Sequence, residues 1–206
     1  MGKLTLEDIQ FIDTYLWNSD IHYEDVRIEM VDHVASEIEH RMNEGDTRDF
    51  YHIFKEYMVA HKASLVKEGS KPFNWKIFKS VSIKLLKNLV TWQVLLGSIG
   101  CFWIFNEIYS YFYIDSVWGS LFPTFLLVLV AFIPLIVFGK KKFSFIGNFG
   151  VLITVFFSFN YQFIPHLKEP STFYYIYLGV LTLFFVGSLK TMISLVIFYK
   201  KRMQLA

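Results

Sequence analysis

The chain has 206 residues, of which 54% are hydrophobic, 19% aromatic and 18% charged, and this apolar content exceeds that of ordinary soluble domains. The net charge of +2 hides a segregation: residues 1–61 carry 5 Lys and Arg against 14 Asp and Glu, residues 62–87 carry 7 against 1, and the rest carries 8 against 3. An acidic N-terminal region is poorly suited to binding phosphates, so we expect a membrane protein that does not bind nucleic acid directly. A single cysteine, Cys101, excludes an intramolecular disulfide and a cysteine metal site.

Three short helices are predicted in the N-terminal region. Thr5 followed by Asp8 has the spacing of a helix N-cap, which predicts a first helix over residues 5–17. A second helix is predicted from about Tyr23 to Gly45, since glycine suits a left-handed C-terminal cap.

Asp46 and Thr47 are predicted to cap the third helix. This helix has an apolar stripe at helical spacing, made of Phe50, Ile53, Phe54, Tyr57 and Met58. About 60 residues make only a marginal core. We therefore expect this region to pack on a partner or on its own membrane domain.

The second helix divides into two faces at about 100° per residue. Its apolar arc contains Ile28, Met30, Val31, Val34, Ala35, Ile38 and Met42. Arg27 lies near the middle of this arc, where an unpaired guanidinium would be costly. We therefore predict a structural ion pair to Asp13 or Asp20.

The polar face of the same helix is the predicted partner-binding surface, formed by Glu29, Asp32, His33, Glu37 and His40. Glu37 and His40 also have the Glu-x-x-His spacing of carboxylate-bridged metal bundles. The neighbouring helices supply no second such pair, so a solvated face is the preferred interpretation. We expect no metal site and no cofactor.

A basic stretch precedes the apolar part of the chain. Residues 67–87 alternate apolar side chains with lysines predicted to lie at a membrane surface, namely Lys71, Lys76, Lys79, Lys84 and Lys87. A plain juxtamembrane linker explains the same pattern equally well. The segment Gly69–Pro72 is the predicted hinge.

Four apolar segments each approach the roughly 20 residues needed to cross a bilayer, at about 89–109, 121–138, 143–164 and 173–198. Lysines flank them before the first segment, between the second and third, and after the fourth, so these regions and both termini are predicted to be cytoplasmic. The second segment, with two prolines, leaves a re-entrant hairpin open as an alternative. No comparable apolar run precedes Leu89, so we expect no secretory signal.

Few ionisable residues interrupt these segments. Glu107 is expected near an interface and Lys190 near the cytoplasmic end of the last span. Close helix contacts are predicted at small residues, namely Gly97, Gly100, Gly147 and Gly150. A buried charge near the midplane, which an ion-coupled transporter normally needs, is not evident.

The segment Asp25-Val26-Arg27-Ile28-Glu29-Met30-Val31-Asp32-His33, followed by Glu37, Gly45 and a third helix, resembles the HAAS signalling domain. The resemblance covers roughly residues 4–66. Members of that family are small helical heads fused to multi-span membrane regions. The resemblance implies a cytoplasmic signalling module whose partner is a regulator protein of the PadR-like kind.

The sequence thus predicts an all-α chain with three parts. Residues 1–66 form an acidic three-helix cytoplasmic head, residues 67–87 a basic amphipathic segment, and residues 88–206 a four-span domain. No phosphate loop, zinc-binding helix or nucleophile elbow is present, so we expect no enzyme. The predicted function is a signalling or regulatory protein of a bacterial inner membrane, with a cytoplasmic regulator, the bilayer and further copies of the chain as partners. The alternative is a small transporter or an auxiliary subunit of a membrane complex.

Overall fold

The computed structural model describes residues 3–71, 73–162 and 171–205. Within these ranges the regular elements are all α-helices, which confirms the predicted fold class. The helices form two compact units. The N-terminal unit contains the described residues up to Asn74 together with Lys140–Phe145, and the span unit contains Trp75–Gly139 and Ile146–Leu205.

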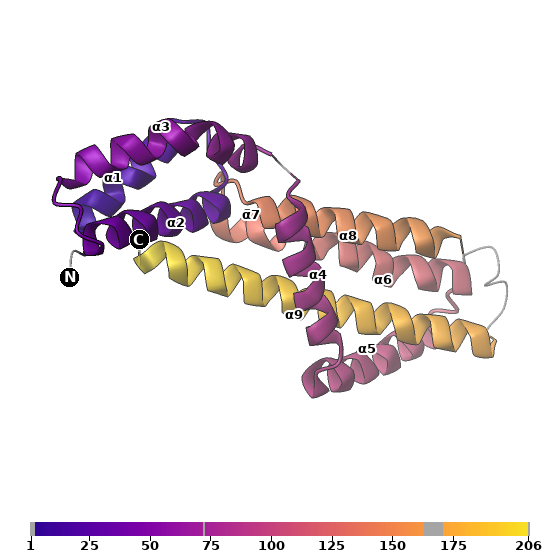
Figure 1. The fold of residues 1–206 in the computed structure, drawn as a ribbon. Coiled ribbons are helices and arrows are strands. Elements are labelled where there is room, and N and C mark those ends of the chain that lie inside the picture. The colour runs from indigo at the N-terminus through magenta and orange to yellow at the C-terminus, as the bar shows by residue number, and fades with distance from the viewer. Residues whose placement is uncertain (1–2, 72, 163–170, 206) are drawn as a thin grey trace. The chain divides into compact units, whose positions relative to one another are not determined.

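The N-terminal unit is built on α1 (Leu6–Trp17), α2 (Glu24–Asn43) and α3 (Phe50–Gly69), which Figure 1 draws in indigo to magenta. Thr5 caps α1 as predicted, because its hydroxyl accepts from the N–H of Asp8 while the Asp8 carboxylate accepts from the N–H of Thr5. Gly45 follows α2 with φ of 103°, a left-handed conformation that a residue without a β-carbon adopts readily.

The N-cap of the third helix was predicted at Asp46 or Thr47, and this prediction is wrong. Asp49, rather than Asp46 or Thr47, is the N-cap of α3 and accepts from the N–H of His52. The carboxylate of Asp46 instead accepts from the backbone N–H and the guanidinium of Arg48. Because Asp46 binds Arg48, the backbone N–H of His52 in the first turn of α3 is left to Asp49.

The core of the N-terminal unit follows the predicted stripes. Fully buried side chains come from all three helices and the turn after α1, namely Ile12, Leu16, Ile21, Val34, Ile38 and Ile53. The distant segment 140–145 adds Phe143 and Phe145, which are 3% and 0% exposed. A unit of about 70 residues has only a small hydrophobic core, and the two phenylalanines of this segment enlarge that core.

The span unit contains most of the apolar sequence, in α4 (Trp75–Leu89), α5 (Trp92–Tyr111), α6 (Ser116–Val130), α7 (Ile133–Phe138), α8 (Ser144–Tyr161) and α9 (Thr172–Leu205). The first two residues of α8, Ser144 and Phe145, belong to the N-terminal unit. Among the described residues, three stretches are long and apolar enough to cross a membrane, namely 117–138, 144–161 and 172–203. The first of these stretches includes α6 and α7, and it overlaps the apolar segment predicted at about 121–138. Pro134 lies in the first turn of α7, where proline is tolerated.

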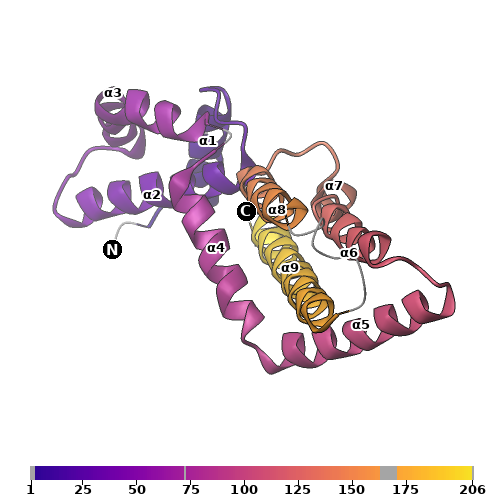
Figure 2. The ribbon, with the colours of Figure 1, turned by 90° about the vertical axis from the view of Figure 1, so that its right-hand side faces the viewer.

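The fourth candidate is a bent pair. Helices α4 and α5 qualify together, but they meet at an angle of 71°, and Figure 2 shows them turning at this bend. The break at Val90 and Thr91 places the start of the apolar helix at Trp92 rather than at Leu89. The part of the chain that the structure describes therefore has three to four candidate spans.

Helix α9 packs against α4, α5 and α6. The rings of Phe156 and Phe184 stack with centroids 3.7 Å apart, which joins α8 to α9. Of the glycines predicted to allow close contact, Gly97 does so, since a β-carbon there would lie 3.1 Å from Val186. Among the described residues, a β-carbon at Gly100 or Gly150 would meet nothing within 4 Å, so the close contacts predicted at these two glycines are not found there.

Candidate functional site

Arg27 is held between two carboxylates at the start of α2. Its side chain is 8% exposed, with Nε 2.7 Å from Asp13 Oδ1 and Nη2 2.8 Å from Glu24 Oε2. The guanidinium also lies over the ring of Trp17, 4.8 Å from its centroid, where cation–π attraction adds to the ion pairs. Asp13 is one of the two partners expected from the sequence, whereas the side chain of Asp20 is 85% exposed.

Asp25 binds the first residues of α8. It is 3% exposed, and one carboxylate oxygen accepts from the N–H of Ser144 at 2.8 Å. The other accepts from the Ser144 hydroxyl at 2.8 Å and from the N–H of Phe145 at 2.9 Å. Asp25 thereby satisfies N–H groups that the start of a helix leaves without partners. Burial raises the pKa of the Asp25 carboxyl, and the hydrogen bonds from Ser144 and Phe145 oppose that rise.

The backbone beside Asp25 pairs with the same segment. The N–H of Glu24 donates to the carbonyl of Lys142 at 2.8 Å, and Tyr23 forms a parallel bridge with Lys142. Sequence reasoning missed these contacts because their partners lie about 120 positions apart. Asp25 did not stand out in the sequence either, because acidic residues are common in the first turn of a helix, where they complement the helix dipole.

The five residues predicted to bind a partner share one side of α2. The exposed ones are Glu29, Asp32, His33 and His40, and Glu37 is half-buried. Several engage neighbours in the same unit: Glu37 pairs with Arg41 at 3.1 Å, His40 with Glu44 at 3.3 Å, and His33 Nδ1 lies 3.4 Å from the Tyr57 hydroxyl. Glu37 and His40 thus have different partners. Across the described ranges, no group of three or more His, Cys, Asp and Glu side chains is arranged to hold a metal ion.

A groove with an aromatic lining runs between α1 and α3. Its volume is about 900 Å³, and its lining includes Phe11, Tyr15, Tyr51, Phe54, Met58 and Val59. The rings contact one another edge to face, with centroids 5.3 Å apart for Phe11 and Phe54 and 5.1 Å apart for Tyr15 and Phe54. Phe11 is 41%, Tyr51 52% and Val59 81% exposed. Exposed apolar side chains gathered in this way are typical of interaction sites.

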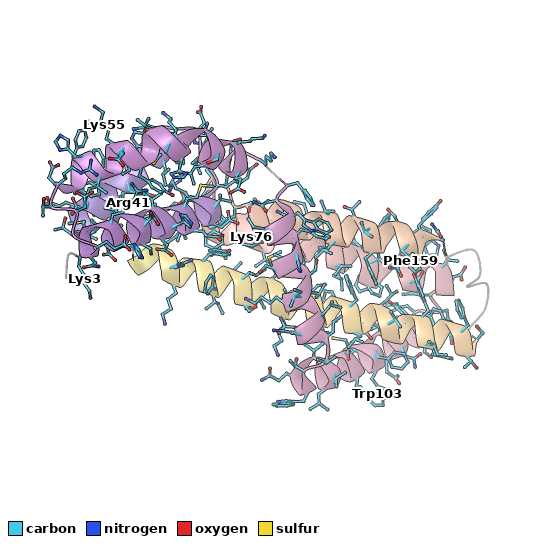
Figure 3. The ribbon with its side chains drawn as sticks, viewed as in Figure 1. Lys3, Arg41, Lys55, Lys76, Trp103 and Phe159 are labelled. Carbon is cyan, nitrogen blue, oxygen red and sulfur yellow. The ribbon has the colours of Figure 1, made fainter. Side chains whose placement is uncertain are left out.

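Two lysines border this groove. Lys55 and Lys62 both belong to its lining, and the ammonium of Lys62 lies 5.1 Å from the centroid of the Tyr15 ring. Figure 3 labels Lys55 on the outer side of α3. The groove was not predicted, although Phe11, Tyr15 and Tyr51 were available as aromatic residues outside the expected apolar stripes.

The lysines predicted to lie at a membrane surface precede or belong to α4. Lys71, Lys76, Lys79 and Lys87 are exposed, and Lys84 is half-buried, with its ammonium 5.8 Å from the centroid of the Phe198 ring. The opposite side of α4 buries Val81 and Leu85. The helix is therefore amphipathic as expected, and binding of its lysines to lipid stays a prediction. Pro72, part of the predicted hinge, lies outside the described residues.

Lys190 reaches polar groups at the bend between α4 and α5. Its ammonium donates to Thr91 Oγ1 at 2.9 Å and to Gln93 Oε1 at 2.7 Å. Nearby, the Asn88 amide donates to Thr191 Oγ1 at 2.8 Å. These bonds give Lys190 a structural role in joining α9 to the bend.

No family model, curated protein or solved structure matches the chain. The HAAS resemblance therefore stays a prediction.

Proposed function

We propose that this chain is a regulatory membrane protein whose N-terminal unit binds a protein partner in the groove between α1 and α3. The observation that carries the proposal is the cluster of aromatic and apolar side chains that line this groove, among them the exposed Phe11, Tyr51 and Val59. Large aromatic side chains in a concavity are the commonest energetic anchors of protein interfaces. The HAAS-like segment supports a signalling role of this kind, on the cytoplasmic face of the membrane.

The groove suits an amphipathic helix. Its lining includes the exposed rings of Phe11 and Tyr51 and the largely buried ring of Phe54, and an apolar face of a helix could pack on such a surface, as in helix-in-groove recognition. Lys55 and Lys62 border the groove, so acidic side chains beside the apolar face would be complementary to it. The proposed partner is therefore an acidic amphipathic helix of a regulator protein, and the proposed role is not enzymatic.

The polar face of α2 is the other candidate surface for binding a partner. The polar residues of α2 are charged and partly engaged with Arg41, Glu44 and Tyr57. Such a surface offers little apolar area to a partner, and exposed ion pairs contribute only about 0–1 kcal/mol each. The groove is therefore the stronger of the two candidate surfaces.

The experiment compares two variants of the full-length protein that place a charge on adjacent residues of α3. Val59→Asp puts a carboxylate in the groove, whereas Ala60→Asp puts the same charge on an exposed residue outside its lining. Each protein is purified in mild detergent, co-purifying proteins are identified by mass spectrometry, and the affinity of the purified partner is then measured. We expect the wild type and Ala60→Asp to bind and Val59→Asp to lose at least tenfold in affinity.

Retention of the partner by Val59→Asp would contradict the proposal, as would failure of the wild type to recover any protein beyond those found with an unrelated four-span protein. A third variant, Glu29→Gln with Asp32→Asn, separates the two surfaces. If this variant alone lost the partner, the binding surface would be α2 and not the groove.

A further inference from the structure

A second cavity of the N-terminal unit carries an inference of its own. Its volume is about 500 Å³, and it is lined by Trp17, His22, Glu24, Lys140, Lys141 and Lys142. Three consecutive lysines therefore share one small cavity with an aromatic ring and an imidazole. This cavity is separate from the groove between α1 and α3, which has none of these residues in its lining.

The charge balance of this cavity is positive. Among the described residues that line it, Glu24 is the only one with a carboxylate. Arg27 already binds Glu24 at 2.8 Å, with the Lys141 ammonium further away at 4.0 Å. Lys140 and Lys142 are exposed. Within the described ranges neither has an Asp or Glu at ion-pair distance. Positive potential focused in a concavity attracts anions.

The backbone that carries these lysines is held in place. The carbonyl of Lys142 accepts from Glu24, and Ser144 and Phe145 donate to the buried Asp25. A ligand that binds the lysines therefore does not have to order the backbone of the segment first, and this preorganisation favours affinity.

The position of the segment in the chain identifies the anion. Residues 140–142 connect two candidate spans, one ending at Phe138 and the other beginning at Ser144. They therefore lie within a few residues of a bilayer surface, where basic side chains meet phospholipid headgroups. Trp17, 45% exposed, adds a side chain that favours the membrane interface.

We propose that this cavity binds the phosphate of an anionic phospholipid headgroup, with Lys140 and Lys142 supplying the charge and Trp17 flanking the headgroup. The same chemistry could accept inorganic phosphate in solution. A headgroup is favoured because the segment is tied to the bilayer at both ends by the adjoining candidate spans. This inference is independent of partner binding at the groove.

Native mass spectrometry of the full-length protein in a nonionic detergent tests the inference. Short-chain phosphatidylglycerol, short-chain phosphatidylcholine and inorganic phosphate are titrated separately, and bound molecules are counted. The test variant is Lys140→Gln with Lys142→Gln. The control is Lys200→Gln with Lys201→Gln, which removes the same charge from exposed residues near the end of α9.

We expect phosphatidylglycerol to bind the wild type and the control at least tenfold more tightly than phosphatidylcholine, and the test variant to lose this preference. Equal loss in both variants would indicate a general charge effect and would overturn the inference. It would also be overturned if the wild type showed no preference between the lipids, or if inorganic phosphate at the same concentration displaced the lipid completely.

Discussion

At the scale of single residues, the charged side chains that hold the N-terminal unit together are the buried ones. Arg27 and Asp25 are both buried in the first turn of α2, yet they bind different parts of the unit. Arg27 holds α1 through Asp13, and Asp25 holds the segment that begins α8. The sequence predicted the ion pair of Arg27 because a guanidinium on an apolar helical arc must have a partner. It gave no comparable reason to single out Asp25.

Replacing Arg27 with Met should destabilise the N-terminal unit. The change would leave Glu24, whose side chain is 11% exposed, with only the more distant ammonium of Lys141 at 4.0 Å, and it would remove the contact with Trp17. We expect a loss of about 3 kcal/mol in the free energy of unfolding, measured by chemical unfolding of the full-length protein in detergent. Arg48→Met, at a pair 50% and 55% exposed, should lose much less, because solvent screens exposed ion pairs. Equal losses would argue against a buried ion pair.

Replacing Asp25 with Ala should release the segment at residues 140–145. The N–H groups of Ser144 and Phe145 would lose their acceptor, at a cost of about 2 kcal/mol. We expect faster amide hydrogen exchange at these two residues. The control is Asp32→Ala, an exposed position on the same helix, and exchange that stays unchanged in Asp25→Ala would contradict the role of Asp25.

At the scale of elements, the packing of α4 on α9 depends on one glycine that the sequence did not single out. A β-carbon at Gly187 would lie 2.3 Å from Leu89 Cδ2 and 3.3 Å from Leu89 Cγ. Gly179 of the same helix has nothing within 4 Å. Helical spacing alone does not distinguish these glycines, because the difference comes from which neighbour each one faces.

This difference predicts opposite outcomes for the same change. Gly187→Ala should push Leu89 away and lower stability by about 1–3 kcal/mol, whereas Gly179→Ala should be neutral or stabilising, since alanine favours helix. The thermal melting temperature of the full-length protein in detergent measures both. Similar melting temperatures for the two variants would show that α4 does not pack on α9 in this way.

The connection between α2 and α3 predicts a pH dependence. Hydrogen bonds from Arg48 lower the pKa of Asp46 from its ordinary 3.8 to about 2, and Arg48 also pairs with Glu56 of α3 at 2.7 Å. A carboxyl whose pKa is lowered by folding stabilises the folded state above its unfolded pKa. This contribution is lost as the pH falls from about 4 toward about 2.

The melting temperatures of the wild type and Asp46→Asn should therefore differ at neutral pH and converge over that range. In an Arg48→Gln background the same substitution should have little effect at any pH. A difference that persists at pH 2, or that survives the loss of Arg48, would count against this interpretation.

At the scale of the whole molecule, the N-terminal unit constrains the membrane topology. It contains residues on both sides of the stretch 75–139, and its two parts can share one compact unit only on the same face of a membrane. That stretch must then cross an even number of times. Since α6 and α7 together form one candidate span, we predict that the bent pair α4 and α5 forms a second one, which would give the described residues four spans.

Single-cysteine labelling in a Cys101→Ser background tests this topology. A membrane-impermeant maleimide should label Lys3→Cys, Lys141→Cys and Lys201→Cys from one face and Tyr113→Cys from the other. Labelling of Lys3→Cys and Tyr113→Cys from the same face would mean three crossings, and the bond between Asp25 and Ser144 could not then form.

The sequence by itself determined the helical class, the approximate position of each apolar segment and the cap at Thr5. These features depend on neighbours within one or two helical turns, or on the length of an apolar run. Only the tertiary structure revealed the binding of Asp25 to the start of α8, the cavity at Lys140–Lys142, the groove between α1 and α3, and the contact at Gly187. Each of these depends on residues that are distant in sequence and become neighbours only when the chain packs, so no local pattern could predict them.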